Sequence, residues 1–214
     1  MPNQQHPLRR GQTRGRQLRR RIAVEAARLI SESGLRDYQQ AKRKAAQRLG
    51  IPGEFNFPDN GEIQEALREH QRLFHGDSQP EILRHRREAA REALRFFAPW
   101  EPRLVGAVLD GSADVHSAVC LHLHTDHPNA VALFLRERAI PYRQQTRRLR
   151  LSRDTAAEFP VFLFSADDIA IDLTVLPYDR LRQAPLDRID ERPMRRVGLA
   201  GLEEMLERGI SDER

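Results

Sequence analysis

The stretch Val119-Cys120-Leu121-His122-Leu123-His124-Thr125 alternates apolar and polar side chains along its length. A period of two is typical of a β-strand that buries one face and turns the other toward polar surroundings. The three aliphatic side chains are therefore predicted on the core side, and Cys120, His122 and His124 on the opposite side. This strand is the centre from which we interpret the rest of the chain.

Further strands are predicted around it. Apolar runs favour strands over 104–109, 159–164 and 169–176, with a turn at Ala166 to Asp168, and a basic strand is predicted over 142–151. A helix is expected from Asp126 and Pro128 through Arg138. The proline-bearing segment 177–196 is predicted to be extended, and a last helix covers 199–206.

The residues before position 100 show helical rather than strand periodicity. Helices are predicted over 17–33 and 37–49, a third begins at the capping-box pair Asp59 and Glu62, and a fourth runs from Ser78 to about Phe97. The predicted fold class is α+β. The predicted divisions are a disordered basic arm (1–16), a helical region (17–100), and a mixed-sheet domain with flanking helices and an extended C-terminal segment (101–214).

The charge is concentrated at the N-terminus. The chain carries a formal net charge of +5, yet residues 1–21 hold seven arginines and no acid, so the remainder sums to −2. Such an arm attracts phosphate-rich partners through counterion release, and we expect RNA or another acidic macromolecule to bind it. The alternative is a solvated tail without a dedicated partner. The arginines are Arg9, Arg10, Arg14, Arg16, Arg19, Arg20 and Arg21.

Membrane and secreted classes are not expected. The longest apolar runs fall short of the ~20 residues that cross a bilayer, and no apolar segment follows the basic N-terminus as in a signal peptide. The single cysteine, Cys120, excludes an internal disulfide framework. We therefore expect a cytoplasmic protein with no membrane partner, and the sequence leaves its oligomeric state open.

Three short motifs resemble those of nucleotidyltransferases. Asp110-Gly111-Ser112 follows an apolar run, Ser117-Ala118-Val119-Cys120-Leu121 resembles the Ser-Asp-x-Asp-Leu motif, and Ile171-Asp172-Leu173 lies where the family has a third carboxylate. The resemblance implies a nucleotidyltransferase-like mixed sheet, nucleotide phosphates bound at Gly111 and Ser112, and Mg²⁺ held by carboxylates for catalysis.

The chain departs from that pattern at the catalytic positions. Ala118 and Cys120 stand where the family has aspartates, so Asp172 is the one catalytic candidate left. A single carboxylate cannot hold two Mg²⁺ ions, and we expect a non-catalytic protein that binds a nucleotide, RNA or a macromolecular partner. The alternative is an active nucleotidyltransferase or phosphotransfer enzyme that combines Asp172 with Asp110 or Asp114.

The whole chain also resembles an uncharacterised family of proteobacterial proteins. The features concerned are 41–46 (Ala-Lys-Arg-Lys-Ala-Ala), 102–106 (Pro-Arg-Leu-Val-Gly) and 182–186 (Arg-Gln-Ala-Pro-Leu). Members are sometimes labelled nucleotidyltransferase-like and sometimes UDP-N-acetylmuramate–alanine ligase. Such a ligase needs a Gly-Lys-Ser or Gly-Lys-Thr phosphate loop, and neither occurs in this sequence.

Two other hypotheses remain. Cys120, His122 and His124, with Asp172 from a partner strand, have the thiolate and imidazole ligands that Zn²⁺ prefers, which would suit a metal-dependent hydrolase. The plainer alternative is a polar sheet face that carries imidazoles. The chain could also be a pure protein-interaction module. Finally, the basic run Arg147, Arg148, Arg150 and Arg153 is interpreted as a strand edge that meets phosphate or blocks sheet pairing.

Overall fold

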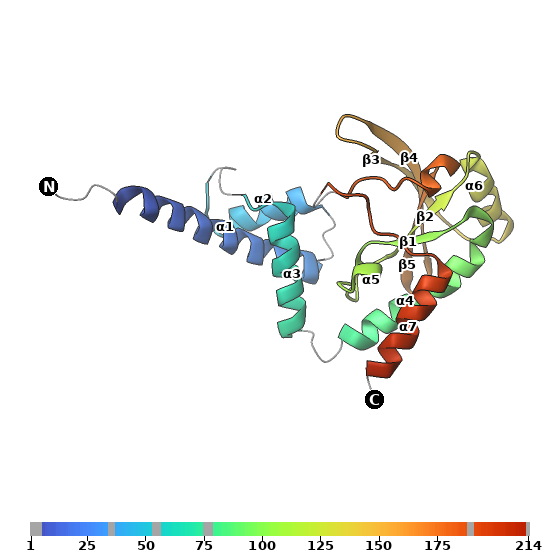
Figure 1. Cartoon of the computed structure of the whole chain (residues 1–214), viewed down its shortest axis with the longest axis horizontal. Helices are drawn as coiled ribbons and strands as arrows, with labels where there is room; N and C mark the ends of the chain where they lie inside the picture. Colours follow the sequence, from blue (N-terminus) through green and yellow to red (C-terminus); the bar gives the residue numbers. More distant parts are fainter. Residues whose placement is uncertain (1–5, 34–36, 53–56, 75–78, 188–190, 213–214) are drawn as a thin grey trace. The chain divides into compact units, whose positions relative to one another are not determined.

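A computed structural model describes residues 6–33, 37–52, 57–74, 79–187 and 191–212 (Figure 1). The chain divides into two compact units, residues 1–77 and 78–214. Helices α1 (His6–Ser33), α2 (Tyr38–Arg48) and α3 (Asn60–Phe74) belong to the first unit. Helix α1 begins at His6, so its backbone includes most of the segment predicted to be a disordered arm. No helix in the described residues is long and apolar enough to cross a membrane.

The first unit is a small bundle in which α1 packs against both α2 and α3. Its core is rich in alanine, with larger side chains from Ile22, Leu29 and Ile63. The predicted capping box is confirmed: Glu62 N–H donates to the Asp59 carboxylate, and Asp59 N–H donates to the Glu62 carboxylate, both at 2.8 Å. These bonds satisfy two N–H groups that the start of α3 would otherwise leave without partners.

The second unit is built around a mixed sheet. Its strands among the described residues are β1 (Arg103–Val105), β2 (Val119–His124), β3 (Arg143–Arg150), β4 (Ala156–Ala166) and β5 (Ile169–Leu176), in the order β1-β2-β5-β4-β3. Strands β2 and β5 are parallel, and the other neighbours are antiparallel. The α+β class and most of the predicted strands are thereby confirmed.

One face of this sheet carries the main apolar core. Leu121 and Leu123 of β2 and Leu173 of β5 pack there with residues of the helices α4 (Gln79–Phe96), α6 (Pro128–Glu137) and α7 (Leu199–Asp212). Helices α4 and α7 lie side by side against it (Figure 1). The predicted domain boundary near residue 100 therefore shifts to 77/78, because Ala90, Leu94 and Phe97 of the α4 region are buried in the core of the sheet unit.

The predicted strand over 104–109 is much shorter in the structure. Strand β1 ends at Val105, and Gly106 adopts φ 74° and ψ −153°, which leads directly into the short helix α5 (Ala107–Asp110). Side chains are strongly disfavoured in that backbone region, so the glycine permits the change of direction. Val108 and Leu109 are buried as predicted, but they reach the core from a helical turn rather than from a strand.

The C-terminal segment 177–197 crosses between the two edges of the sheet. It begins with the 3₁₀ turns η3 (Tyr178–Leu181), and Leu186 N–H donates to the carbonyl of Arg150 at the end of β3. Val197 then forms an isolated bridge with Leu104 of β1. The segment was predicted to be extended, and its described residues Leu186 and Val197 contact opposite edges of the sheet. A shorter 3₁₀ turn, η2 (Ala98–Trp100), connects α4 to β1.

Candidate functional site: the polar face of the sheet

The sheet face opposite the main core carries a row of polar side chains. The register pairs Cys120 with Asp172 and His122 with Thr174, so these residues of β2 and β5 lie side by side on this face. His122, Asp172 and Thr174 are each at most 3% exposed. Buried polar groups at the centre of a sheet require partners, and these partners define the chemistry of the site.

Asp172 is held by an arginine from a strand two positions away in the sheet. Arg147 on β3 donates from Nη1 to Oδ1 at 2.9 Å and from Nη2 to Oδ2 at 2.7 Å, and its Nη1 also donates to Thr174 Oγ1 at 2.8 Å. Burial lowers the pKa of Arg147, but the hydrogen bonds and charge of Asp172 outweigh it and raise the pKa overall. The result is a two-pronged ion pair in which both carboxylate oxygens are occupied.

His124 anchors the C-terminal segment to this face. Its Nδ1 lies 2.8 Å from the carbonyl of Glu101, and its Nε2 lies 3.3 Å from Arg196 Nη1. Because a guanidinium can only donate, Nε2 is the acceptor and the proton resides on Nδ1, which donates to Glu101. Arg196 also donates to the carbonyls of Arg180 and Leu181. Burial lowers the pKa of His124, which keeps the imidazole neutral in this role.

His122 is the unusual member of the row. Its Nδ1 is buried and has no hydrogen-bond partner within the part of the chain that the structure describes. Burial is the largest cause of a lowered pKa at His122, and together with the neighbouring His124, Arg196 and Arg147 it brings the pKa to about 3. The ring is therefore neutral at physiological pH.

These contacts leave no zinc ligand set. Asp172 is occupied by Arg147, His124 is tied to Glu101 and Arg196, and the Cys120 thiol lies 3.7 Å from the carbonyl of Ala118. Throughout the described ranges, no group of three or more His, Cys, Asp or Glu side chains is arranged to hold a metal ion. The predicted set of Cys120, His122, His124 and Asp172 thus shares a face but does not converge on one point.

Mg²⁺ does not fit this face either. Of the strand residues that the register places on this side, Asp172 is the one carboxylate, and it already has Arg147 as its counterion. The two other acids considered for catalysis have partners of their own. Asp110 lies 3.5 Å from Arg195, and Asp114 accepts from Ser117 Oγ and His116 N–H within its own loop.

The N–H groups of the predicted phosphate-binding turn form hydrogen bonds within the turn itself. Gly111 ends α5 with φ 79°, and the N–H groups of Gly111 and Ser112 both donate to the carbonyl of Ala107. Arg87 of α4 lies beside the turn and donates to the carbonyl of Val108 at 3.4 Å. The two N–H groups that were expected to approach phosphates are therefore used inside the turn.

The arginine arm is part of helix α1. Arg16, Arg19, Arg20 and Arg21 are exposed, and none of the four makes a hydrogen bond or ion pair through its side chain with any described residue. The side chains of Arg9, Arg10 and Arg14 lie outside what the structure describes. These four guanidinium groups of α1 thus have no counterion among the residues that the structure describes.

Arg147 is the functional residue that sequence reasoning missed. Its run of arginines was interpreted as a basic strand edge, and β3 is an edge strand of the sheet, but the Arg147 side chain also reaches over β4 to a buried acid. A signal did exist: Asp172 lies within the apolar run 169–176, and a carboxylate in such a run needs a cationic partner.

Comparison of this chain with protein-family models, with curated proteins and with solved structures yields no match.

Proposed function

We propose that this chain is a non-catalytic nucleic-acid-binding protein that contacts phosphates through the arginines at the start of α1. The observation that carries this proposal is a set of exposed guanidinium groups with no counterion among the described residues, Arg16, Arg19, Arg20 and Arg21. We propose further that its sheet unit is a nucleotidyltransferase-like scaffold that has lost its catalytic carboxylates, and that the protein acts in the cytoplasm.

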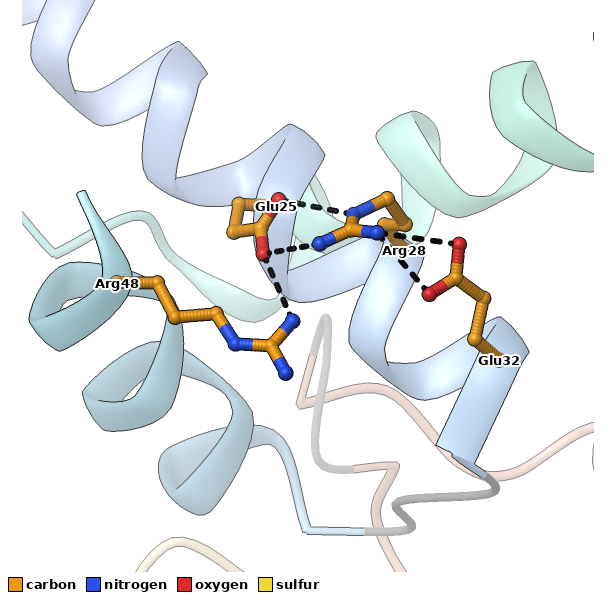
Figure 2. Close-up of polar contacts among 4 residues, drawn as sticks. All are labelled: Glu25, Arg28, Glu32 and Arg48. Atoms are coloured by element: carbon orange, nitrogen blue, oxygen red, sulfur yellow. Dashed lines mark hydrogen bonds and ion pairs between the residues drawn. The ribbon is translucent and has the colours of Figure 1, made fainter.

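The two acids of α1 are already engaged with other arginines. Figure 2 shows Glu25 between Arg28 and Arg48, and Glu32 on the other side of Arg28. The Glu25 carboxylate accepts from Arg28 at 2.9 and 3.0 Å and from Arg48 at 3.3 Å. These contacts lower the pKa of Glu25, so it remains ionised and committed to this network. The positive charge toward the N-terminus of α1 is therefore left for an external partner.

Phosphates are the partner that this charge favours. A guanidinium presents paired N–H donors that match phosphate oxygens, and several of them along one helix can contact successive phosphates. A membrane surface is a poorer match, because an interfacial helix needs an apolar face to insert. The apolar face of α1, with Ile22, Ala26 and Leu29, is buried in the bundle core.

The ion pair between Arg147 and Asp172 supports the non-catalytic part of the proposal. Two-metal phosphoryl transfer needs several converging carboxylates, and Asp172, the one acid among the described strand residues of the polar face, already has an arginine as its counterion. In such a scaffold the guanidinium group of Arg147 takes the place of a metal ion beside Asp172 and holds the strands together.

Binding of labelled oligonucleotides over a range of salt concentrations tests the proposal. We expect the triple variant Arg19→Gln/Arg20→Gln/Arg21→Gln to flatten the log–log salt slope for a single strand by about 2, since each lost phosphate contact removes ~0.7. The matched control is Arg136→Gln/Arg143→Gln/Arg148→Gln, which removes three exposed arginines from the sheet unit and the same net charge. It should leave the slope unchanged.

The partners are compared in the same assay. The affinities for an RNA and a DNA strand of the same sequence show which nucleic acid is preferred, and a preference for either one supports the proposal. Poly-glutamate of matched charge that binds as tightly as the oligonucleotides would reassign the partner to an acidic protein and overturn it. Equal loss of slope in the two triple variants would overturn it as well, because the effect would then follow net charge alone.

A further inference from the structure

An open groove lies along α1, next to the exposed arginines. Its volume is about 530 Å³, and its lining comes from α1 and from the end of α2. Four of the lining residues fall at positions i, i+3, i+4 and i+7 of α1 and so share one helix face. The lining residues are Gln17, Arg20, Arg21, Val24, Glu25 and Leu49.

The groove combines an apolar surface with two cations, Arg20 and Arg21, that have no ion-pair partner in the described part of the chain. Val24 is 47% exposed, whereas Ile22, Ala23 and Ala26 around it are buried in the bundle. Leu49 adds a second aliphatic side chain that is partly buried against the same core. The Glu25 carboxylate does not neutralise the groove, because it is already held by Arg28 and Arg48 (Figure 2).

We infer that this groove receives an unstacked base of a single-stranded nucleic acid, while Arg20 and Arg21 hold the neighbouring phosphates. This inference rests on the proposed function and narrows it to single strands. The volume falls within the ~300–1,000 Å³ that binding pockets for small organic ligands occupy. The flat face of a base can cover Val24 and Leu49, and guanidinium planes can stack on bases as well as bind phosphates.

Charge and shape together favour this occupant. An acidic peptide would satisfy Arg20 and Arg21, but its carboxylates would leave Val24 and Leu49 in water. The bases of a duplex are stacked inside the helix, so a duplex can offer this groove only its phosphates. A single strand presents phosphates and base faces at adjacent positions, which matches the adjacent arginines and aliphatic surface.

The test compares a single strand, its duplex and an abasic strand of the same length, with the full chain and with Val24→Gln. We expect the wild type to bind the single strand more tightly than the other two. Val24→Gln should weaken single-strand binding about fivefold through lost apolar contact, with the duplex affinity and the salt slope unchanged. The control Leu133→Gln replaces a similarly exposed aliphatic residue of α6 and should change nothing.

The outcomes separate this inference from the proposed function. Equal binding of single strand, duplex and abasic strand, with a salt slope that still depends on the α1 arginines, would overturn the base-binding groove and leave the phosphate contact standing. A wild type without salt-dependent binding to any of the three would overturn both. Val24 lies on the surface of α1, so a folding defect is not expected, and circular dichroism of the variant checks this.

Discussion

Arg147 on β3 reaches across β4 and binds both carboxylate oxygens of Asp172 on β5, at 2.7 and 2.9 Å. The two side chains are 27% and 3% exposed, so the acid is buried while the arginine keeps contact with solvent. Such a pair ties three strands together, because its two ends lie on either side of β4. It also neutralises the one carboxylate that the described strands place on the polar face.

We expect Arg147→Met to destabilise the sheet unit by about 3 kcal/mol, at the lower end for a broken buried pair because Arg147 is partly exposed. The cost arises because the Asp172 carboxylate would remain buried without its counterion. Urea unfolding followed by a probe in the sheet unit measures this. Arg148→Met is the matched control: it alters the neighbouring, exposed arginine of β3 and should change stability by less than ~0.5 kcal/mol.

The double variant Arg147→Met/Asp172→Leu distinguishes the ion pair from simple loss of packing. Removing both charges removes the uncompensated acid, so we expect most of the stability to return. A double variant no more stable than Arg147→Met would show that the arginine acts through its aliphatic chain, and the ion-pair explanation would fall.

His122 makes stability depend on pH in a defined window. Its pKa is lowered to about 3 in the folded chain from an ordinary 6.5, so below pH 6.5 the unfolded state binds a proton that the folded state does not. The free energy of unfolding therefore does not depend on the titration of His122 above about pH 6.5. It decreases as the pH falls from 6.5 toward 3, by up to about 1.4 kcal/mol per pH unit. Unfolding at several pH values between 4 and 8 measures the slope.

Replacing His122 with Leu should flatten this dependence and cost little at neutral pH, because the buried Nδ1 has no partner to lose. His116→Gln removes an exposed histidine of the same unit and should preserve the wild-type slope. If His122→Leu and wild type had parallel stability profiles between pH 4 and 6.5, another group would be responsible.

Local sequence patterns predicted helices and strands well where a single pair of residues, or a regular spacing of apolar residues, determines the element. The Asp59 and Glu62 capping box begins α3, and the alternation along 119–124 gives β2 with a polar face. Strand β5 spans 169–176 as expected. In each case the information lies within a few neighbouring residues, so it can be recognised without knowledge of the fold.

The misses depend on contacts that no local pattern contains. Buried Ala90 and Leu94 indicate an apolar face of α4, but the pattern cannot tell whether the helical bundle or the sheet covers that face. Arg147 meets Asp172 only because β4 pairs with both of their strands. The strand predicted over 104–109 ends early because Gly106 takes a backbone angle that the apolar run does not reveal.

The capping box in the first unit gives a local stability prediction. Asp59→Ala removes the acceptor for Glu62 N–H and should cost about 1 kcal/mol at the start of α3. Hydrogen exchange of the first-turn amides, including Ile63, should accelerate accordingly. Glu65→Ala alters an exposed residue of the same helix outside the box and should not accelerate them. Unchanged protection in Asp59→Ala would contradict a capping role.

The last prediction concerns catalysis. Purified protein with Mg²⁺ or Mn²⁺ and labelled nucleoside triphosphates should transfer no nucleotide to RNA, protein or small acceptors. Asp172 is the one carboxylate among the described strand residues of the polar face, and Arg147 holds both its oxygens. Arg147→Ala, which frees Asp172, should be equally inactive, since a single acid cannot position two metal ions. Product formed by the wild type and lost in a folded Asp172→Asn variant would prove the non-catalytic interpretation wrong. Product that appears only in Arg147→Ala would instead mean that the arginine suppresses an activity that the scaffold still has.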